Sequence, residues 1–144
     1  MSLDFTPMGR CIHTLEESLR HLDAVDGNDT LHEIFRNAVI KGFESTLEVS
    51  GNLLRKALQE YMGDPKAISR LVFKDVLRHA ATHDLMTLDE VERWFAYRDS
   101  RNSAAHDYGE AFATHVLGLI RAFVEDAKRL HRTLEERHGR CADT

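Results

Sequence analysis

The longest helical pattern in the chain is TLHEIFRNAVIKGFESTLEVSGNLLRKALQEYM, residues 30–62. Thr30 and Glu33 have the spacing of a capping box, which predicts that the helix begins there. Apolar side chains follow at helical spacing, and they are Ile34, Phe35, Ala38, Val39, Phe43, Leu47, Leu54, Ala57, Leu58 and Tyr61. A helix of this length is long for a globular protein and needs partners for its apolar face. The segment therefore predicts a bundle of packed helices.

The chain on either side of this segment also has helical signals. A narrow apolar stripe predicts a helix over about 5–25, and its members are Met8, Ile12, Leu15, Leu19 and Leu22. After residue 62, Gly63 suits a left-handed C-cap, Asp64 can cap the next helix and Pro65 fits its first position. The next helix is therefore expected to begin here and to extend over about 66–81.

Two further helices complete the pattern. Thr87 and Glu90 repeat the capping-box spacing and predict a helix that continues to about Ala104. The last helix is expected after Gly109, with Phe112, Val116, Leu119, Ile120, Phe123, Ala127, Leu130 and Leu134 on its apolar face. Since no segment alternates as a strand does, the sequence predicts an all-α fold, an up-and-down four-helix bundle with an additional short helix. We expect one domain over residues 1–144, in which about 129–144 form a polar C-terminal extension from the body.

Composition and charge exclude several classes of protein. The chain has 144 residues, of which 42% are hydrophobic and 30% charged, so it can bury a core and is not disordered by composition. Its formal net charge of -5 argues against a broad basic face that grips nucleic acid, and no DNA binding is expected. A local RNA site remains compatible with this charge.

Cysteines, histidines and hydropathy indicate the compartment and the cofactor requirement. Cys11 and Cys141 lack CxxC spacing and are typical of free thiols in a reducing compartment. His79 and His83 are four residues apart, but no carboxylate or cysteine is placed to complete a metal site, so no metal and no cofactor are predicted. His131 falls in the polar extension, as does His138, and neither is assigned a role. With no membrane-length apolar stretch and no signal-peptide pattern, we expect a cytoplasmic protein without membrane contact.

One segment departs from the bundle pattern, RDSRNSAAHDY at residues 98–108. It gathers polar side chains at a junction between two helices, where backbone groups are free and side chains can converge. Arg101 offers a fork of donors that matches phosphate oxygens, and His106 can transfer a proton near neutral pH. Two structural explanations stay open: positive side chains are favoured at a helix C-terminus, and Asp107 can cap the last helix while Tyr108 covers the loop.

Residues 101–108, RNSAAHDY, match the motif R-x4-H-x-Y, and the chain resembles the HEPN superfamily. The nearest branch is similar to the small proteins encoded beside minimal nucleotidyltransferases, known as HepT-type toxins and as nucleotidyltransferase substrate-binding proteins. The resemblance extends to residues 43–48 (FESTLE), to residues 69–74 (SRLVFK) and to Trp94-Phe95 before the motif. It covers nearly the whole chain.

The resemblance implies a homodimer in which two copies of the motif meet in a composite cleft that cuts RNA without a metal. Arg101 would hold the scissile phosphate, and His106 would act as general base or acid on the ribose 2'-hydroxyl or the leaving oxygen. Asn102 would help to orient the site, with Arg98 and Asp107 as supporting residues. Tyr108 matches a tyrosine that partner nucleotidyltransferases can modify with AMP.

Two functional hypotheses follow from the resemblance. In the first, the chain is a ribonuclease toxin neutralised by a minimal nucleotidyltransferase antitoxin that is encoded nearby. In the second, it is a noncatalytic substrate-binding or scaffold subunit of a two-component nucleotidyltransferase. The two differ at His106, whose loss would abolish RNA cleavage only under the first hypothesis.

Overall fold

The computed structural model describes the backbone of residues 3–104 and 110–139 and the side chains of residues 3–101 and 114–138. Its helices are α1 (Thr6–Ala24), α2 (Thr30–Met62), α3 (Pro65–Ser69), α4 (Phe73–Thr82), α5 (Leu88–Ala104) and α6 (Glu110–Leu134). A π-helical turn, η1 (Glu135–Gly139), follows α6 directly. The described ranges contain helices and no strand, which confirms the all-α prediction.

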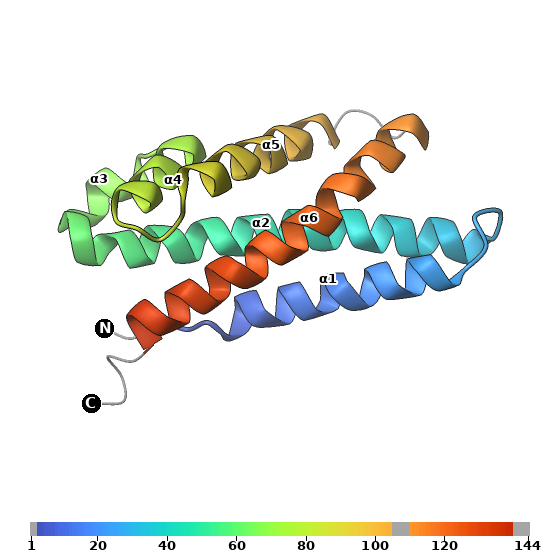
Figure 1. Ribbon diagram of the computed structural model, residues 1–144, viewed down its shortest axis with the longest axis horizontal. Coiled ribbons are helices and arrows are strands. Elements are labelled where there is room, and N and C mark those ends of the chain that lie inside the picture. The colour runs from blue at the N-terminus through green and yellow to red at the C-terminus, as the bar shows by residue number, and fades with distance from the viewer. Residues whose placement is uncertain (1–2, 105–109, 140–144) are drawn as a thin grey trace.

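The long helix α2 is the centre of the arrangement (Figure 1). Helix α1 runs antiparallel to it, and α6 crosses over both in the view of Figure 1 and contacts both. Helices α3 and α4 pack at the C-terminal end of α2, and α5 returns from there and contacts α4 and α6. The predicted stripe of α1 is buried at all five positions, Met8, Ile12, Leu15, Leu19 and Leu22.

An aromatic cluster joins the helices in the core. The ring of Phe123 on α6 lies 5.0 Å from that of Phe43 on α2, measured between centroids. It also lies 5.3 Å from Trp94 and 5.1 Å from Tyr97, both on α5. These edge-on contacts bury large apolar areas and hold three helices together.

Most predicted helix ends are confirmed, and one cap is corrected. Gly63 has φ 71°, the left-handed conformation of a C-cap, and the Asp64 side chain accepts from the amides of Lys66 and Ala67. Helix α2 begins at Thr30 as predicted, but its N-cap is Asp29, whose carboxylate accepts from the amide of Leu31. The capping box predicted for Thr30 is therefore wrong, because the preceding aspartate occupies the cap position.

The single helix expected over about 66–81 is two helices. Helix α3 ends at Ser69, Val72 is extended (φ −70°, ψ 158°), and α4 begins at Phe73. The Ile68 carbonyl at the break accepts from the amide of Leu71 at 3.1 Å, and contacts to α2 accompany the break. Ile68 is buried, and its carbonyl accepts a hydrogen bond from Arg55 on α2 at 2.9 Å. The last carbonyls of a helix have no hydrogen-bond partner within it, and here the side chain of Arg55 donates to one of them.

The segment after residue 129 packs against the body up to residue 138, so the expected polar extension is wrong for this part of the chain. Leu130, Leu134 and His138 are buried. The fully buried His138 side chain has Nδ1 at 2.9 Å from a carboxylate oxygen of Glu60 and Nε2 at 3.4 Å from the hydroxyl of Tyr61. The π-helical turn η1, which contains His138, is thereby joined to the C-terminal end of α2.

None of the described helices is both long enough and apolar enough to span a membrane. Cys11, on α1, is a half-buried free thiol, and Cys141 lies outside the described residues.

The contacts of His138 give a stability prediction. His138→Ala removes a buried polar group from two partners and leaves a cavity, so we expect it to lower the free energy of unfolding by about 1–3 kcal/mol. Urea denaturation followed by circular dichroism measures the difference. His115→Ala, at an exposed position on α6, is the matched control and should change the value by less than about 0.5 kcal/mol. Equal effects of the two substitutions would contradict the assigned anchoring role.

Candidate functional site

Three arginines line one groove at the junction of α2, α4 and α5. The groove has a volume of about 320 Å³. We call it the arginine groove, and it is lined by Leu47, Glu48, Gly51, Asn52, Arg55, Val72, Phe73, Arg98 and Arg101. Arg98 and Arg101 come from the C-terminal half of α5, and Arg55 comes from α2.

A glycine on α2 shapes the floor of this groove. A Cβ atom at Gly51 would lie 2.5 Å from Cε2 of Phe73, so only glycine allows the Phe73 ring to sit directly on the α2 backbone. The guanidinium of Arg98 lies over this ring, with its Cζ 5.3 Å from the ring centroid. This cation–π contact orients Arg98 without neutralising its charge.

The groove concentrates positive charge. Burial lowers the pKa of Arg98, and the charges of Arg101 and Arg55 lower it further, whereas Asp99 raises it. The Asp99 carboxylate also pairs with Lys74, at 3.1 Å. Among the described residues that line the groove, Glu48 is the only carboxylate. The three guanidiniums therefore repel one another and favour an anion between them.

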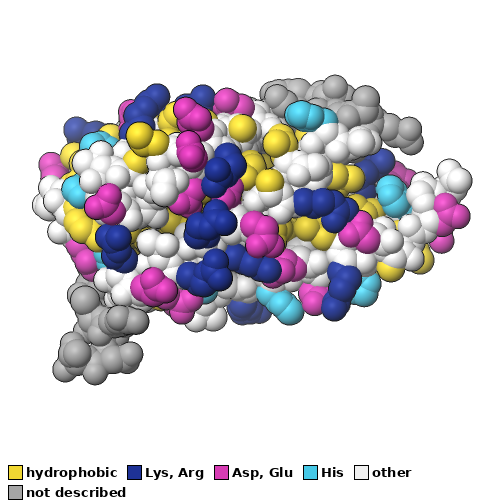
Figure 2. Space-filling model, viewed as in Figure 1, with side chains coloured by type: hydrophobic (Ala, Val, Ile, Leu, Met, Phe, Trp, Pro, Cys, Tyr) yellow, Lys and Arg dark blue, Asp and Glu magenta, His cyan; other side chains and the backbone are white. Residues whose placement is uncertain are grey.

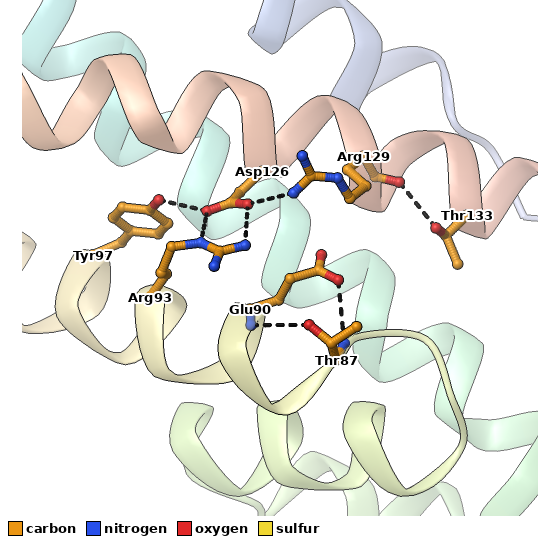
Figure 3. Close-up of polar contacts among 7 residues, drawn as sticks. All are labelled: Thr87, Glu90, Arg93, Tyr97, Asp126, Arg129 and Thr133. Carbon is orange, nitrogen blue, oxygen red and sulfur yellow. Dashed lines mark hydrogen bonds and ion pairs between the residues drawn. The ribbon is translucent and has the colours of Figure 1, made fainter.

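A buried carboxylate fixes the position of α5 (Figure 3). Asp126 on α6 has a side chain that is only 4% exposed. Arg93 donates to its two oxygens through Nε and Nη2 at 2.8 and 2.9 Å, and the Tyr97 hydroxyl donates at 2.6 Å. Arg129 on α6 adds a fourth hydrogen bond at 2.9 Å. Because Tyr97 directly precedes Arg98, these bonds set the rotation of the helix that carries Arg98 and Arg101.

The protonation states suit this role. Burial raises the pKa of the Asp126 carboxyl, but the hydrogen bonds from Arg93 and Tyr97 outweigh it, so the net pKa is lowered. Burial also raises the pKa of Tyr97, and its hydrogen bond to Asp126 raises it further. Asp126 is thus an anion and Tyr97 a neutral donor at neutral pH.

The start of α5 is fixed as predicted. The Thr87 hydroxyl accepts from the Glu90 amide at 3.1 Å, and the Glu90 carboxylate accepts from the Thr87 amide at 3.2 Å, which is a complete capping box (Figure 3). Helix α5 is therefore capped at its first turn and joined to α6 farther along, so it holds the arginines rigidly.

The structure brings together some of the predicted site residues. Arg98 and Arg101 lie together in the arginine groove. Asn102 lies on α5, but its side chain is outside the described set. The predicted His106, Asp107 and Tyr108 all lie outside the described residues.

Sequence reasoning missed Arg55. A usable signal was present, because Glu48, Asn52 and Arg55 follow one another at spacings of four and three. That spacing places the three polar side chains on one side of the helix. All three residues line the groove.

One of the two histidines considered for a metal, His83, has another contact. His83 stacks on Tyr61 with ring centroids 4.6 Å apart. Within residues 3–101 and 114–138, no group of three or more His, Cys, Asp or Glu side chains could hold a metal ion.

Charges elsewhere are interspersed. Figure 2 shows Lys and Arg side chains mixed with Asp and Glu side chains over the viewed face. Two of the described ion pairs join α1 to α6: Arg121 with Asp23 at 2.6 Å, and Lys128 with Glu16 at 2.5 Å. The arginine groove thus differs from these two places, where each positive side chain pairs with a carboxylate.

Comparison with known proteins gives a family and a fold. Residues 3–136 match a family model described as nucleotidyltransferase substrate binding protein like. The probable ribonuclease HepT of Haemophilus influenzae is 26% identical over 140 residues, which cover 94% of each chain.

Two solved structures share the fold. One, from Haemophilus influenzae, is described as revealing the fold of a substrate binding domain of a nucleotidyltransferase. It has a TM-score of 0.80 and 24% identity, and the match covers 92% of this chain and 99% of that one. The other is a tri-AMPylated Shewanella oneidensis HEPN toxin in complex with MNT antitoxin. It has a TM-score of 0.66 and 16% identity, with 93% of this chain and 98% of that one covered.

The Asp126 contacts predict how stability depends on pH. Since the folded-state pKa of Asp126 is below the ordinary value of 3.8, its contribution is complete above that value and is lost as pH falls through the folded-state pKa. Asp126→Asn should lower the free energy of unfolding at pH 7 by about 2–3 kcal/mol and flatten the acid side of the stability profile.

Urea denaturation at pH values from about 2 to about 7 measures both effects, because this range includes the titration of an aspartate carboxyl group. Glu125→Gln, at an exposed neighbouring position on α6, is the control and should leave the profile nearly unchanged. An acid limb of the same steepness in Asp126→Asn and the unsubstituted chain would show that another group governs it.

Proposed function

The chain belongs to the nucleotidyltransferase substrate binding protein like family, and from this membership we propose that it is a HEPN ribonuclease toxin of a toxin–antitoxin pair. The predicted resemblance to HEPN and HepT-type proteins is confirmed at the level of family and fold. The observation that carries the proposal is the arginine groove. It places Arg101, the first residue of the R-x4-H-x-Y motif, beside two further guanidiniums in a site suited to a phosphate.

The proposed reaction uses the motif residues alone. His106 takes the proton of a ribose 2'-hydroxyl, and the 2'-oxygen attacks the adjacent phosphorus. The bond from phosphorus to the 5'-oxygen breaks and that oxygen receives the proton that His106 had taken, which leaves a cyclic phosphate and a 5'-hydroxyl. Arg101 holds the phosphate oxygens and stabilises the charge that develops on them. Fixed guanidinium charge supplies the electrostatic stabilisation, so the proposed reaction requires no metal and no cofactor.

We propose that the working unit is a homodimer whose two motifs face one cleft. Each chain has a net charge of -5, so positive potential has to be local to hold RNA. Two arginine grooves brought together provide that potential. Asn102 and Asp107 then orient the motif around the bound phosphate.

The proposed antitoxin is a minimal nucleotidyltransferase encoded nearby. In the proposed step the Tyr108 oxygen attacks the α-phosphorus of ATP, loses its proton and releases pyrophosphate, so that AMP stays on the tyrosine. The added AMP is bulky and negatively charged, and Tyr108, which would carry it, is two residues from His106 in the sequence. It would compete with RNA for the same guanidiniums. The description of the Shewanella oneidensis toxin as tri-AMPylated and bound to its antitoxin supports this proposal.

A noncatalytic role is the second candidate. The family's description names substrate binding, and the Haemophilus influenzae structure is described as a substrate binding domain. In that case the arginine groove would bind a phosphorylated group for a nucleotidyltransferase and would not cleave RNA.

RNA cleavage decides between the two candidates. The chain expressed alone should cut RNA in the presence of a metal chelator. His106→Ala should reduce the rate by about 10²–10⁴-fold, and Arg101→Ala by about 10²–10³-fold. Gel analysis of purified RNA, with detection of cyclic phosphate ends, measures the products.

Matched controls are available on other faces of the bundle. Arg132→Ala on α6 and His32→Ala on α2 remove the same residue types and should leave cleavage unchanged. Intact RNA with the unsubstituted chain, together with nucleotidyltransferase binding that survives His106→Ala, would favour the noncatalytic role.

AMP modification gives a separate test. After co-expression with the neighbouring nucleotidyltransferase, mass spectrometry of peptides should locate AMP on Tyr108, and the modified chain should lose RNA cleavage. Tyr108→Phe should remove the modification. The two other tyrosines serve as internal controls, since Tyr97 donates its buried hydroxyl to Asp126 and Tyr61 contacts His138. Full neutralisation with unmodified Tyr108 would overturn this part of the proposal.

A further inference from the structure

The α2 side of the arginine groove has its own polar stripe. Glu48, Asn52 and Arg55 line the groove, while Leu47, Leu54 and Leu58 on the same helix are buried in the core. Side chains in a polar stripe of a bundle helix do not pack in the hydrophobic core and are available for other contacts. The groove is the place where this stripe meets α5.

Arg55 is held in place with donors to spare. Its Nη1 donates to the carbonyl of Ile68 at 2.9 Å, at the C-terminal end of α3. A guanidinium has several N–H groups in a fixed plane. No other hydrogen bond from Arg55 is made to the part of the chain that the structure describes. One edge is therefore anchored while the rest can bind a ligand.

The charge of Arg55 on α2 acts on Arg98, which lies on α5 with the motif residue Arg101. It lowers the pKa of Arg98, as the charge of Arg101 does, so both guanidiniums lie within electrostatic range of Arg98. Among the described residues that line the groove, three positive charges face one carboxylate, that of Glu48, while Asp99 acts on Arg98 without lining the groove. A phosphodiester has a single negative charge, so one phosphate bound to Arg101 leaves positive charge unbalanced.

We propose that Arg55 binds a second phosphate of the RNA strand, next to the phosphate that Arg101 takes. This inference rests on the proposed function and extends it to the α2 side of the groove. Arg98, held over Phe73, lies with both arginines in the groove. Glu48 is seven residues from Arg55, or about 10 Å along the helix axis, and repels phosphate at the other end of the stripe.

Salt dependence of RNA binding tests the assignment. The full-length chain with His106→Ala, so that RNA stays intact, is titrated with a single-stranded oligoribonucleotide over a range of salt concentrations. Each phosphate contact contributes about 0.7 to the slope of log Kd against log salt for single strands. Adding Arg55→Gln should reduce the slope by about 0.7, which corresponds to about fivefold weaker binding at 0.1 M salt than the parent shows.

Two variants separate phosphate binding from a structural effect. Arg55→Lys keeps the charge and should restore most of the slope, although it changes the hydrogen bond to Ile68. Lys56→Gln removes an exposed positive charge from the adjacent position of α2, which does not line the groove, and should leave the slope unchanged. A purely structural role would lower affinity without changing the slope.

The results distinguish this inference from the proposed function. A slope that Arg55→Gln leaves unchanged, or that falls equally in Lys56→Gln, would overturn the second phosphate site even if the chain cleaves RNA. A slope reduced only in Arg55→Gln would support it, even if cleavage assays showed no ribonuclease activity.

Discussion

The structure depends on one buried anion, the carboxylate of Asp126. Its burial is unfavourable unless donors surround it, and the donors that do so come from α5 as well as from α6. The pair of bonds from Arg93 and the bond from Tyr97 can form together only at one rotation of α5 about its axis. Since the next helical turn carries Arg98 and Arg101, a core contact determines which way the site residues face.

The arginine groove is the opposite case, in which like charges are gathered. Each described support in it orients a guanidinium and leaves its charge in place: the Phe73 ring under Arg98 and the Ile68 carbonyl beside Arg55. Such an arrangement is unfavourable in the free protein because the charges repel. It is the behaviour expected of a preorganised anion site, where the ligand supplies the missing negative charge.

Much of the fold could be predicted from local signals. Periodicity and caps located α1, α2 and α5, because Gly63, Asp64 and the Thr87–Glu90 pair act within a few residues of their own position. The break at residues 70–72 was missed because it has no glycine or proline and depends on α2. The anchoring of His138 was missed because its partner Glu60 is far away in the sequence. Arg55 was missed for the same reason, since its role depends on how α3 and α5 pack on α2.

The electrostatic effects of the chain's net charge and of the charges in the arginine groove differ in the distances over which they act. At physiological salt, charges on the surface are screened beyond about 8 Å. On the face drawn in Figure 2, positive and negative side chains are mixed, so an approaching nucleic acid gains little binding energy from that face. A phosphate inside the groove, whose volume is about 320 Å³, would instead lie among the guanidiniums that line it. Under the proposed function, an acidic protein can thus bind RNA at one place without general affinity for polyanions, and an AMP group placed in that same short range would weaken the attraction and occupy part of the site.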